Sequence, residues 1–129
     1  MERDQATELI HNLLRGMISK KASDLFITTG FPPAFKIDGK MTPVSSQALS
    51  MQHTQELARS IMNDRQASEF EATHECNFAI SPHSIGRFRV NVFLQHDDRC
   101  APLGHVVCHI RQIRYGVTFH TPGLGRVIA

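Results

Sequence analysis

The sequence predicts an α+β domain in which helices cover one face of a mainly antiparallel sheet. The chain begins with an amphipathic segment, turn signals separate short extended runs, and three runs in the second half alternate polar and apolar residues. The resulting order is one helix, three short strands, two helices and three more strands, which is typical of an α+β domain. The second face of such a sheet is either exposed or covered by a partner.

Length and composition are those of a single soluble domain. The 129 residues can bury a hydrophobic core, since 41% of them are hydrophobic and 20% are charged. A formal net charge of +2 is too small to indicate nucleic-acid binding. No segment has the length of a membrane span and the N-terminus is charged, so we expect a cytoplasmic protein without a secretory signal. Cys76, Cys100 and Cys108 have an irregular spacing that predicts neither a disulfide framework nor a zinc site.

The first helix is expected from about Asp4 to Lys20, because apolar residues recur there three and four positions apart. Asp4 is a suitable N-cap, and Lys20 and Lys21 suit the negative end of the helix dipole. The apolar stripe consists of Ala6, Leu9, Ile10, Leu13, Leu14, Met17 and Ile18.

Short strands and one hairpin should follow this helix. Leu25–Thr29 reads as a strand that ends at the glycine and prolines of residues 30–33. Ala34–Ile37 and Lys40–Val44 flank Asp38-Gly39, the strongest short hairpin signal in the chain.

Two helices are expected next. The longer one runs from about Ser50 to Asn63, and a short one spans about Arg65–Ala72 with Asp64 as its N-cap. The longer helix should bury Leu57, Ala58, Ile61 and Met62.

The alternating runs Glu75–Ile80, Arg87–Gln95 and His105–Ile113 should complete the sheet. The segment from Arg114 to Ala129 has three glycines, one proline and no persistent period. We therefore expect one domain over residues 1–113 and a linker or frayed end over residues 114–129.

Arg87 and Arg89 are the most informative polar residues. Apolar residues alternate with them along the strand, so both arginines should lie side by side on its polar face. Two guanidinium groups on a rigid strand suit a phosphate or a carboxylate. Spacing alone favours the simpler interpretation that they solvate an outer strand face. Since no residue that would do chemistry lies nearby, the pair indicates a domain that holds or senses an anion.

The remaining polar residues predict no catalytic or metal site. His105 and His109 share a strand face but lie four residues apart, and His74 and Cys76 lack a third ligand. We expect Cys76 to be a small core residue, and Asp24 to cap a turn or to pair with a lysine. The phosphate-binding patterns G-x-x-x-x-G-K-[ST] and G-x-G-x-x-G are absent from the sequence.

Three segments, in this order, carry a resemblance to a known family. They read SDLFITTGFPPAFKIDGKMTPV, IMNDRQASEFEATHECNFAI and IGRFRVNVFLQ. Over roughly Leu9 to Gln95, about two thirds of the chain, the sequence resembles the N-terminal domain of the type IV pilus retraction ATPases of the PilT/PilU family. That family belongs to the secretion ATPase superfamily.

The resemblance implies a PAS-like fold that a flexible linker joins to a RecA-like ATPase domain, which is absent from this sequence. In the family, six subunits form a ring at the inner face of the cytoplasmic membrane, and each N-terminal domain packs against the ATPase domain of the next subunit. Hydrolysis of ATP with Mg²⁺ drives pilus disassembly and twitching motility. The chain would then be either an excised N-terminal domain or the product of a gene that lost its motor half. Alone it would bind no cofactor and catalyse no reaction.

The family also implies roles for particular arginines. Arginines of a Gly-Arg-Phe-Arg-Val strand approach the phosphates of ATP, and Arg87 and Arg89 hold those positions here. A further arginine comes from a Val-Leu-Arg-Arg-Ile run on the following strand. This chain inserts His96–Leu103 and then reads HVVCHIRQI, so that arginine falls either at Cys108-His109 or at Arg111-Gln112. We favour Arg111.

Two other hypotheses stay open at this point. The chain could be a free-standing PAS-like module that binds a small ligand or a protein, which would need a pocket beneath the sheet lined by residues such as Phe26, Phe35 and Phe88. A small metal-dependent enzyme that uses the histidines is the hypothesis that the residues favour least.

Overall fold

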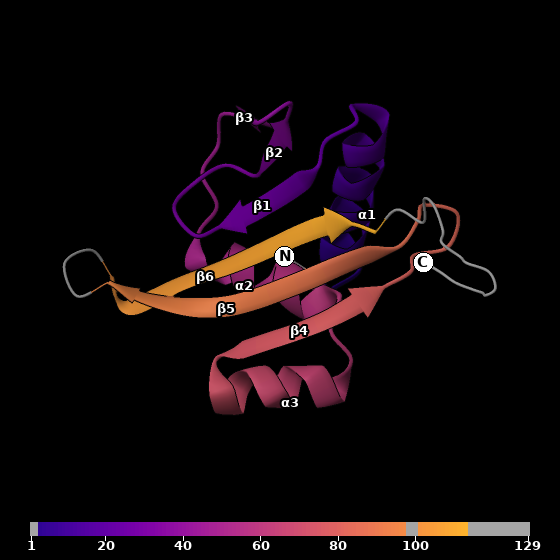
Figure 1. Ribbon diagram of the computed structural model, residues 1–129. Helices are drawn as coiled ribbons and strands as arrows, with labels where there is room; N and C mark the ends of the chain where they lie inside the picture. Colours follow the sequence, from indigo (N-terminus) through magenta and orange to yellow (C-terminus); the bar gives the residue numbers. More distant parts are fainter. Residues whose placement is uncertain (1–2, 98–100, 114–129) are drawn as a thin grey trace.

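The computed structural model describes residues 3–97 and 101–113, which form three helices and six strands in the predicted order (Figure 1). The elements are α1 (Arg3–Ser19), β1 (Asp24–Thr28), β2 (Ala34–Ile37), β3 (Lys40–Pro43), α2 (Met51–Ser60), α3 (Asp64–Thr73), β4 (Glu75–Ile80), β5 (Phe88–Asp97) and β6 (Ala101–Gln112). The predicted α+β class is confirmed. The linker or frayed end predicted over residues 114–129 lies outside the described residues.

All six strands belong to one sheet with the order β3-β2-β1-β6-β5-β4. Every pairing between neighbouring strands is antiparallel, as predicted. The centre of the sheet joins β1 to β6, so strands from the beginning and the end of the domain lie side by side. The two edges are β3 and β4.

The helices are placed unequally on this sheet. Figure 1 shows α1 and α2 behind the sheet, whereas α3 runs beside the edge strand β4. Helix α3 has no fully buried residue, and it contacts the core only through partly buried side chains such as Ala67 and Phe70. We call the face that α1 and α2 leave uncovered the open face. Over residues 3–97 and 101–113, no helix is long and apolar enough to cross a membrane.

The hydrophobic core lies between the sheet and the first two helices. It consists of Ala6, Ile10, Leu13, Leu14, Met17, Ala22, Leu25, Ile27, Phe35, Leu57, Ala58, Met62, Cys76, Phe88, Val90, Val92, Val106, Cys108 and Ile110. Ile18, which the helical spacing assigned to the apolar stripe, lies in the last turn of α1 and is 36% exposed. Thr54 is fully buried among apolar neighbours, where its hydroxyl forms hydrogen bonds with Thr29 and with the Ser50 carbonyl.

Helix α2 starts close to Ser50, as predicted, whereas the N-cap predicted for α3 is wrong. Ser50 caps α2 by accepting a hydrogen bond from the backbone N–H of His53. Asn63, rather than Asp64, caps α3. Its side chain accepts from the N–H of Gln66, whose own side chain accepts from the N–H of Asn63, and this forms a capping box.

The β5–β6 hairpin is longer than the sequence predicts. We expected strands over Arg87–Gln95 and His105–Ile113, but β5 continues to Asp97 and β6 begins at Ala101. Much of the inserted segment His96–Leu103 therefore extends the two strands, with a register shift between Gln95 and Asp97. Figure 1 shows this hairpin projecting beyond the ends of its neighbours.

Candidate functional site on the open face of the sheet

Arg89 and Arg111 lie directly opposite each other on β5 and β6. The neighbours of Arg89 in the chain, Phe88 and Val90, are fully buried, so alternation places the exposed Arg89 side chain on the open face, as predicted. Arg111 is also exposed, since 66% of its side chain is accessible to solvent. The register of the hairpin thus places two guanidinium groups directly opposite each other on adjacent strands, where like charges repel each other.

Arg87 stands immediately before β5. Its backbone carbonyl accepts a hydrogen bond of 2.8 Å from the N–H of Ile113, which fixes the chain beside the end of β6. Arg87 is exposed and lies two residues before Arg89, so alternation, if it extends one residue beyond β5, directs both side chains to the same face. The structure brings Arg89 and Arg111 together on the open face, with Arg87 close to them in the chain.

A row of charged residues continues from these arginines across the sheet. Arg111 lies opposite Asp24 on β1, and Asp24 lies opposite Lys36 on β2. In register, Arg89, Arg111, Asp24 and Lys36 occupy successive strands, and we call them the charged row. It holds three cations and one carboxylate.

Asp24 is the buried member of the charged row, with 6% of its side chain exposed. Its Oδ2 lies 2.6 Å from Nε2 of His109 and 3.5 Å from Nη2 of Arg111. Burial alone would raise the pKa of this carboxyl, but hydrogen bonds from Ser23 and His109, and the charges of His109 and Arg111, outweigh burial and lower the pKa. The prediction that Asp24 caps a turn or pairs with a lysine is wrong, because β6 supplies its partners.

His109 is held on the open face by an aromatic neighbour as well as by Asp24. Its ring stacks on Phe26, with the ring centroids 4.6 Å apart and the planes at 7°. The preceding residue, Cys108, points into the core, and burial raises the pKa of its thiol to about 12. Of the two alignments for the family's further arginine, one thus falls on a buried thiol and a paired histidine, and the other on the exposed Arg111.

A shallow hollow of about 470 Å³ adjoins the charged row. Its lining includes three cations and two carboxylates: Lys21, Lys36 and Arg111, and Asp24 and Asp38. The sequence did not single out Lys36, and it placed His109 only on one strand face with His105. Alternation gives the face of each residue on its own strand, but it does not tell which strands are neighbours.

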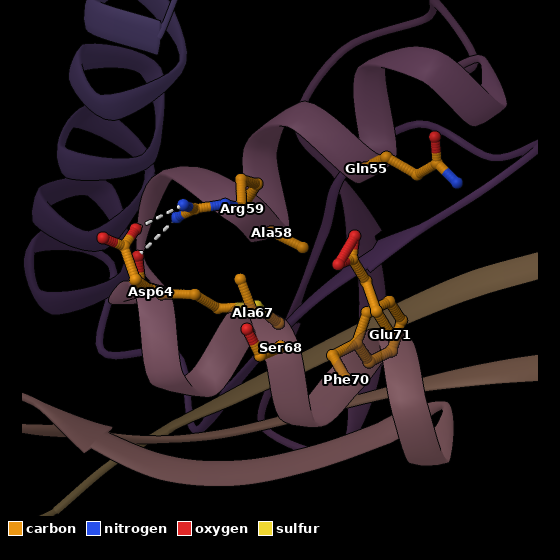
Figure 2. Close-up of a pocket in the computed structure, with 9 residues that line it drawn as sticks. Gln55, Ala58, Arg59, Asp64, Ala67, Ser68, Phe70 and Glu71 are labelled. Atoms are coloured by element: carbon orange, nitrogen blue, oxygen red, sulfur yellow. Dashed lines mark hydrogen bonds and ion pairs between the residues drawn. The ribbon is translucent and has the colours of Figure 1, made fainter.

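A second hollow of about 540 Å³ lies between α2 and α3 (Figure 2). Its lining includes the apolar residues Ala58 and Phe70. At one end, Figure 2 shows Arg59 reaching Asp64, and the two side chains form an ion pair of 2.9 Å. At the other end lies Glu71, well away from that pair. This groove brings together no nucleophile with a base, so it offers no constellation for catalysis.

The pocket that a ligand-binding PAS-like module would need is not formed by the three residues named for it. Phe35 and Phe88 are buried in the core, but Phe26 is on the opposite side of the sheet, where it stacks on His109. Phe26 lines a smaller apolar hollow of about 350 Å³ on the open face, together with Phe31 and Met41.

The cysteines and histidines of the described residues form no further reactive centre. Cys76 is a core residue, as predicted, and burial together with the nearby charge of Glu69 raises the pKa of its thiol. Within residues 3–97 and 101–113, no three His, Cys, Asp or Glu side chains are grouped so that they could hold a metal ion. Cys100 lies outside the described residues.

Comparison with known proteins gives two relatives in Pseudomonas aeruginosa. The chain is 49% identical to its type IV pilus ATPase PilU over 85 residues, which are 66% of this chain and 22% of PilU. It is 34% identical to the type IV pilus retraction ATPase PilT over 87 residues, which are 67% of this chain and 25% of PilT. The chain therefore spans about a quarter of the length of these relatives. No protein-family profile matches it.

A solved structure gives the same answer for the fold. The crystal structure of the pilus retraction motor PilT with bound ADP matches with a TM-score of 0.70 and 28% sequence identity, over 84% of this chain and 30% of PilT. Over the matched residues the chain is homologous to PilU and PilT, and its described residues have the fold of the PilT N-terminal domain.

Proposed function

We propose that this chain serves as the N-terminal domain of a PilT/PilU-like twitching-motility ATPase and supplies Arg87, Arg89 and Arg111 to the phosphates of ATP. The ATP and its Mg²⁺ would be held by a RecA-like motor domain, since the sequence contains no phosphate-binding loop of its own. The observation that carries this proposal is the position of Arg89 opposite Arg111, with the backbone of Arg87 hydrogen-bonded beside the end of β6.

The chemistry of guanidinium groups supports this role. An arginine carries its charge at every physiological pH and can donate two parallel hydrogen bonds to a phosphate. Three arginines at one end of a rigid sheet can stabilise the charge that develops on a transferred phosphoryl group, which is the main requirement of phosphoryl-transfer catalysis. The solved PilT structure that shares this fold contains bound ADP.

The same proposal covers assembly and location. The open face would pack against the motor domain of the same or a neighbouring subunit, so a ring of six subunits would form only when motor domains are present. The complete machine would work in the cytoplasm against the inner membrane, through the proteins of the pilus. The chain alone would bind nucleotide weakly and would turn none over.

Nucleotide binding by the isolated 129-residue chain tests the proposal. Addition of Mg-ATP to the ¹⁵N-labelled chain should shift the backbone and guanidinium signals at Arg87, Arg89 and Arg111. Arg89→Gln and Arg111→Gln should each weaken binding by about threefold or more, because a charge-assisted hydrogen bond is lost in each. Arg65→Gln is the matched control, since Arg65 is exposed on α3, away from the open face.

Two results would reject the proposal. One is Mg-ATP binding that the arginine substitutions leave at the level of the Arg65→Gln control. The other is phosphate release by the isolated chain at the rate of a pilus ATPase, if that activity survives Arg89→Ala.

A further inference from the structure

We propose that Asp24 is a positioning residue for Arg111: its carboxylate holds the guanidinium while no phosphate is bound and gives it up when a phosphate binds. This inference rests on the proposed function, because it concerns how one of the three arginines is kept ready. It assigns a role to the only charged side chain that is buried among the described residues.

The two arginines on β5 and β6 repel each other. Arg89 and Arg111 are directly opposite each other, and like charges in that arrangement destabilise a sheet. None of the described residues forms an ion pair with Arg89, so no side chain on β4 or β5 offsets its charge. Asp24 lies on the far side of Arg111, where its negative charge draws the guanidinium toward β1. This contact offsets part of the repulsion between the two arginines.

The two partners of the Asp24 carboxylate lie at different distances from it. His109 Nε2 lies 2.6 Å from Oδ2 of Asp24, which is a short, strong hydrogen bond, whereas Arg111 Nη2 lies 3.5 Å away. Charge-assisted hydrogen bonds of arginine are usually about 2.7–2.9 Å long, so the contact to Arg111 is a loose one. Arg111 can therefore leave Asp24 without breaking the pair that Asp24 makes with His109.

Asp24 and Arg111 differ in how freely their side chains can move. Asp24 is 6% exposed, and His109, which binds it, is itself fixed by its stack on Phe26. Arg111 is 66% exposed and has room to swing. An arriving phosphate would thus move the arginine and leave the carboxylate in place. After Arg111 departs, Asp24 keeps its hydrogen bond with His109 on β6, and Lys36 lies opposite it on β2.

Inorganic tripolyphosphate is a suitable probe, because it carries the charge of the nucleotide's phosphates and has no base or sugar. Its affinity for the 129-residue chain can be measured by NMR titration. Asp24→Asn keeps the shape of the side chain and an oxygen that can accept from His109, but removes the charge that competes for Arg111. We expect this variant to bind about twofold to fivefold more tightly than the wild type, which is the range that exposed ion pairs contribute.

Asp38→Asn is the matched control. Asp38 is exposed and lines the same hollow, and asparagine tolerates its positive φ of 52°. Asp38→Asn changes the electrostatic field around the hollow without releasing Arg111, so its gain in affinity for tripolyphosphate should be smaller than that of Asp24→Asn. In an Arg111→Gln background, the gain in affinity from Asp24→Asn should also shrink to the gain that Asp38→Asn gives in the same background.

The outcomes separate this inference from the proposed function. Equal affinities for Asp24→Asn and Asp38→Asn overturn the role of Asp24, while the proposed function stands if Arg89→Gln and Arg111→Gln still weaken binding. If Arg111→Gln binds as tightly as the wild type, both the role of Asp24 and the proposed function are overturned. If Asp24→Asn does not fold, the NMR titration of the wild-type chain is the test. Tripolyphosphate must then shift the Nε–Hε signal of Arg111 and leave the ring signals of His109 in place. An unmoved Arg111 signal would reject the role.

Discussion

Arg89→Gln should make the folded domain more stable, although it removes a residue that we place in the phosphate site. Arg89 faces Arg111 across the β5–β6 pair, and like charges directly opposite on neighbouring strands cost a few tenths to about 1 kcal/mol. Asp24 offsets part of this cost through its contact with Arg111. We therefore expect a gain of about 0.2–0.5 kcal/mol in the free energy of unfolding for the wild-type background. With Asp24→Asn present, the repulsion is uncompensated and the gain should reach about 0.5–1 kcal/mol.

Urea denaturation followed by circular dichroism measures this effect, because urea is uncharged and does not screen the arginines. With a slope of about 2 kcal/mol per molar urea, the larger gain moves the midpoint by about 0.25–0.5 M. In 1 M NaCl the screening length falls to about 3 Å, so the gain should disappear. Arg65→Gln on α3 should change the midpoint little at either salt concentration. A loss of stability for Arg89→Gln, or a gain that persists in high salt, would refute the reasoning.

Three other predictions concern stability and reactivity. The pKa of Asp24 is lowered in the folded state, so its charged form stabilises the fold above pH 3.8, and this contribution is lost at lower pH. At pH 7 the wild type should therefore have a higher urea midpoint than Asp24→Asn. A difference between the two midpoints that stays the same near pH 2 would contradict this. Asn63→Ala should cost about 1 kcal/mol because it removes the capping box of α3, whereas Asp64→Ala should cost less; the reverse order in thermal melts would return the cap to Asp64. In a Cys100→Ser chain, Cys76 and Cys108 should resist iodoacetamide at pH 8 until urea unfolds the domain, because both thiols are buried with raised pKa values; mass spectrometry that finds rapid labelling of the native chain would show that the core opens.

The orientation of Arg87 and Arg89 could be predicted from the sequence, because alternation along one strand is a local property. The position of Arg111 could not. It depends on the register between β5 and β6, which the extended hairpin and the shift between Gln95 and Asp97 determine. Two alignments of the last strand were open, and although we favoured Arg111, only the pairing of β5 with β6 places Arg111 opposite Arg89.

The partners of Asp24 were out of reach for a related reason. His109 is 85 residues away in the chain, and no local pattern states that β1 lies next to β6. The cap of α3 is a different case. Asn63 and Asp64 are both good N-cap residues, but only Asn63 has a glutamine three positions later, so the capping-box spacing could have identified it.

The pairing of β1 with β6 also has a consequence for how the domain is made. During synthesis, β1 emerges early and remains an unpaired edge on one side until β6 has left the ribosome. The central pairing joins residues about 85 positions apart, and closing so long a loop slows folding. Asp24 and Arg111 therefore meet only in the finished sheet. Any partial unfolding that detaches β6 would separate the carboxylate from its arginine and Arg89 from its neighbour in a single event.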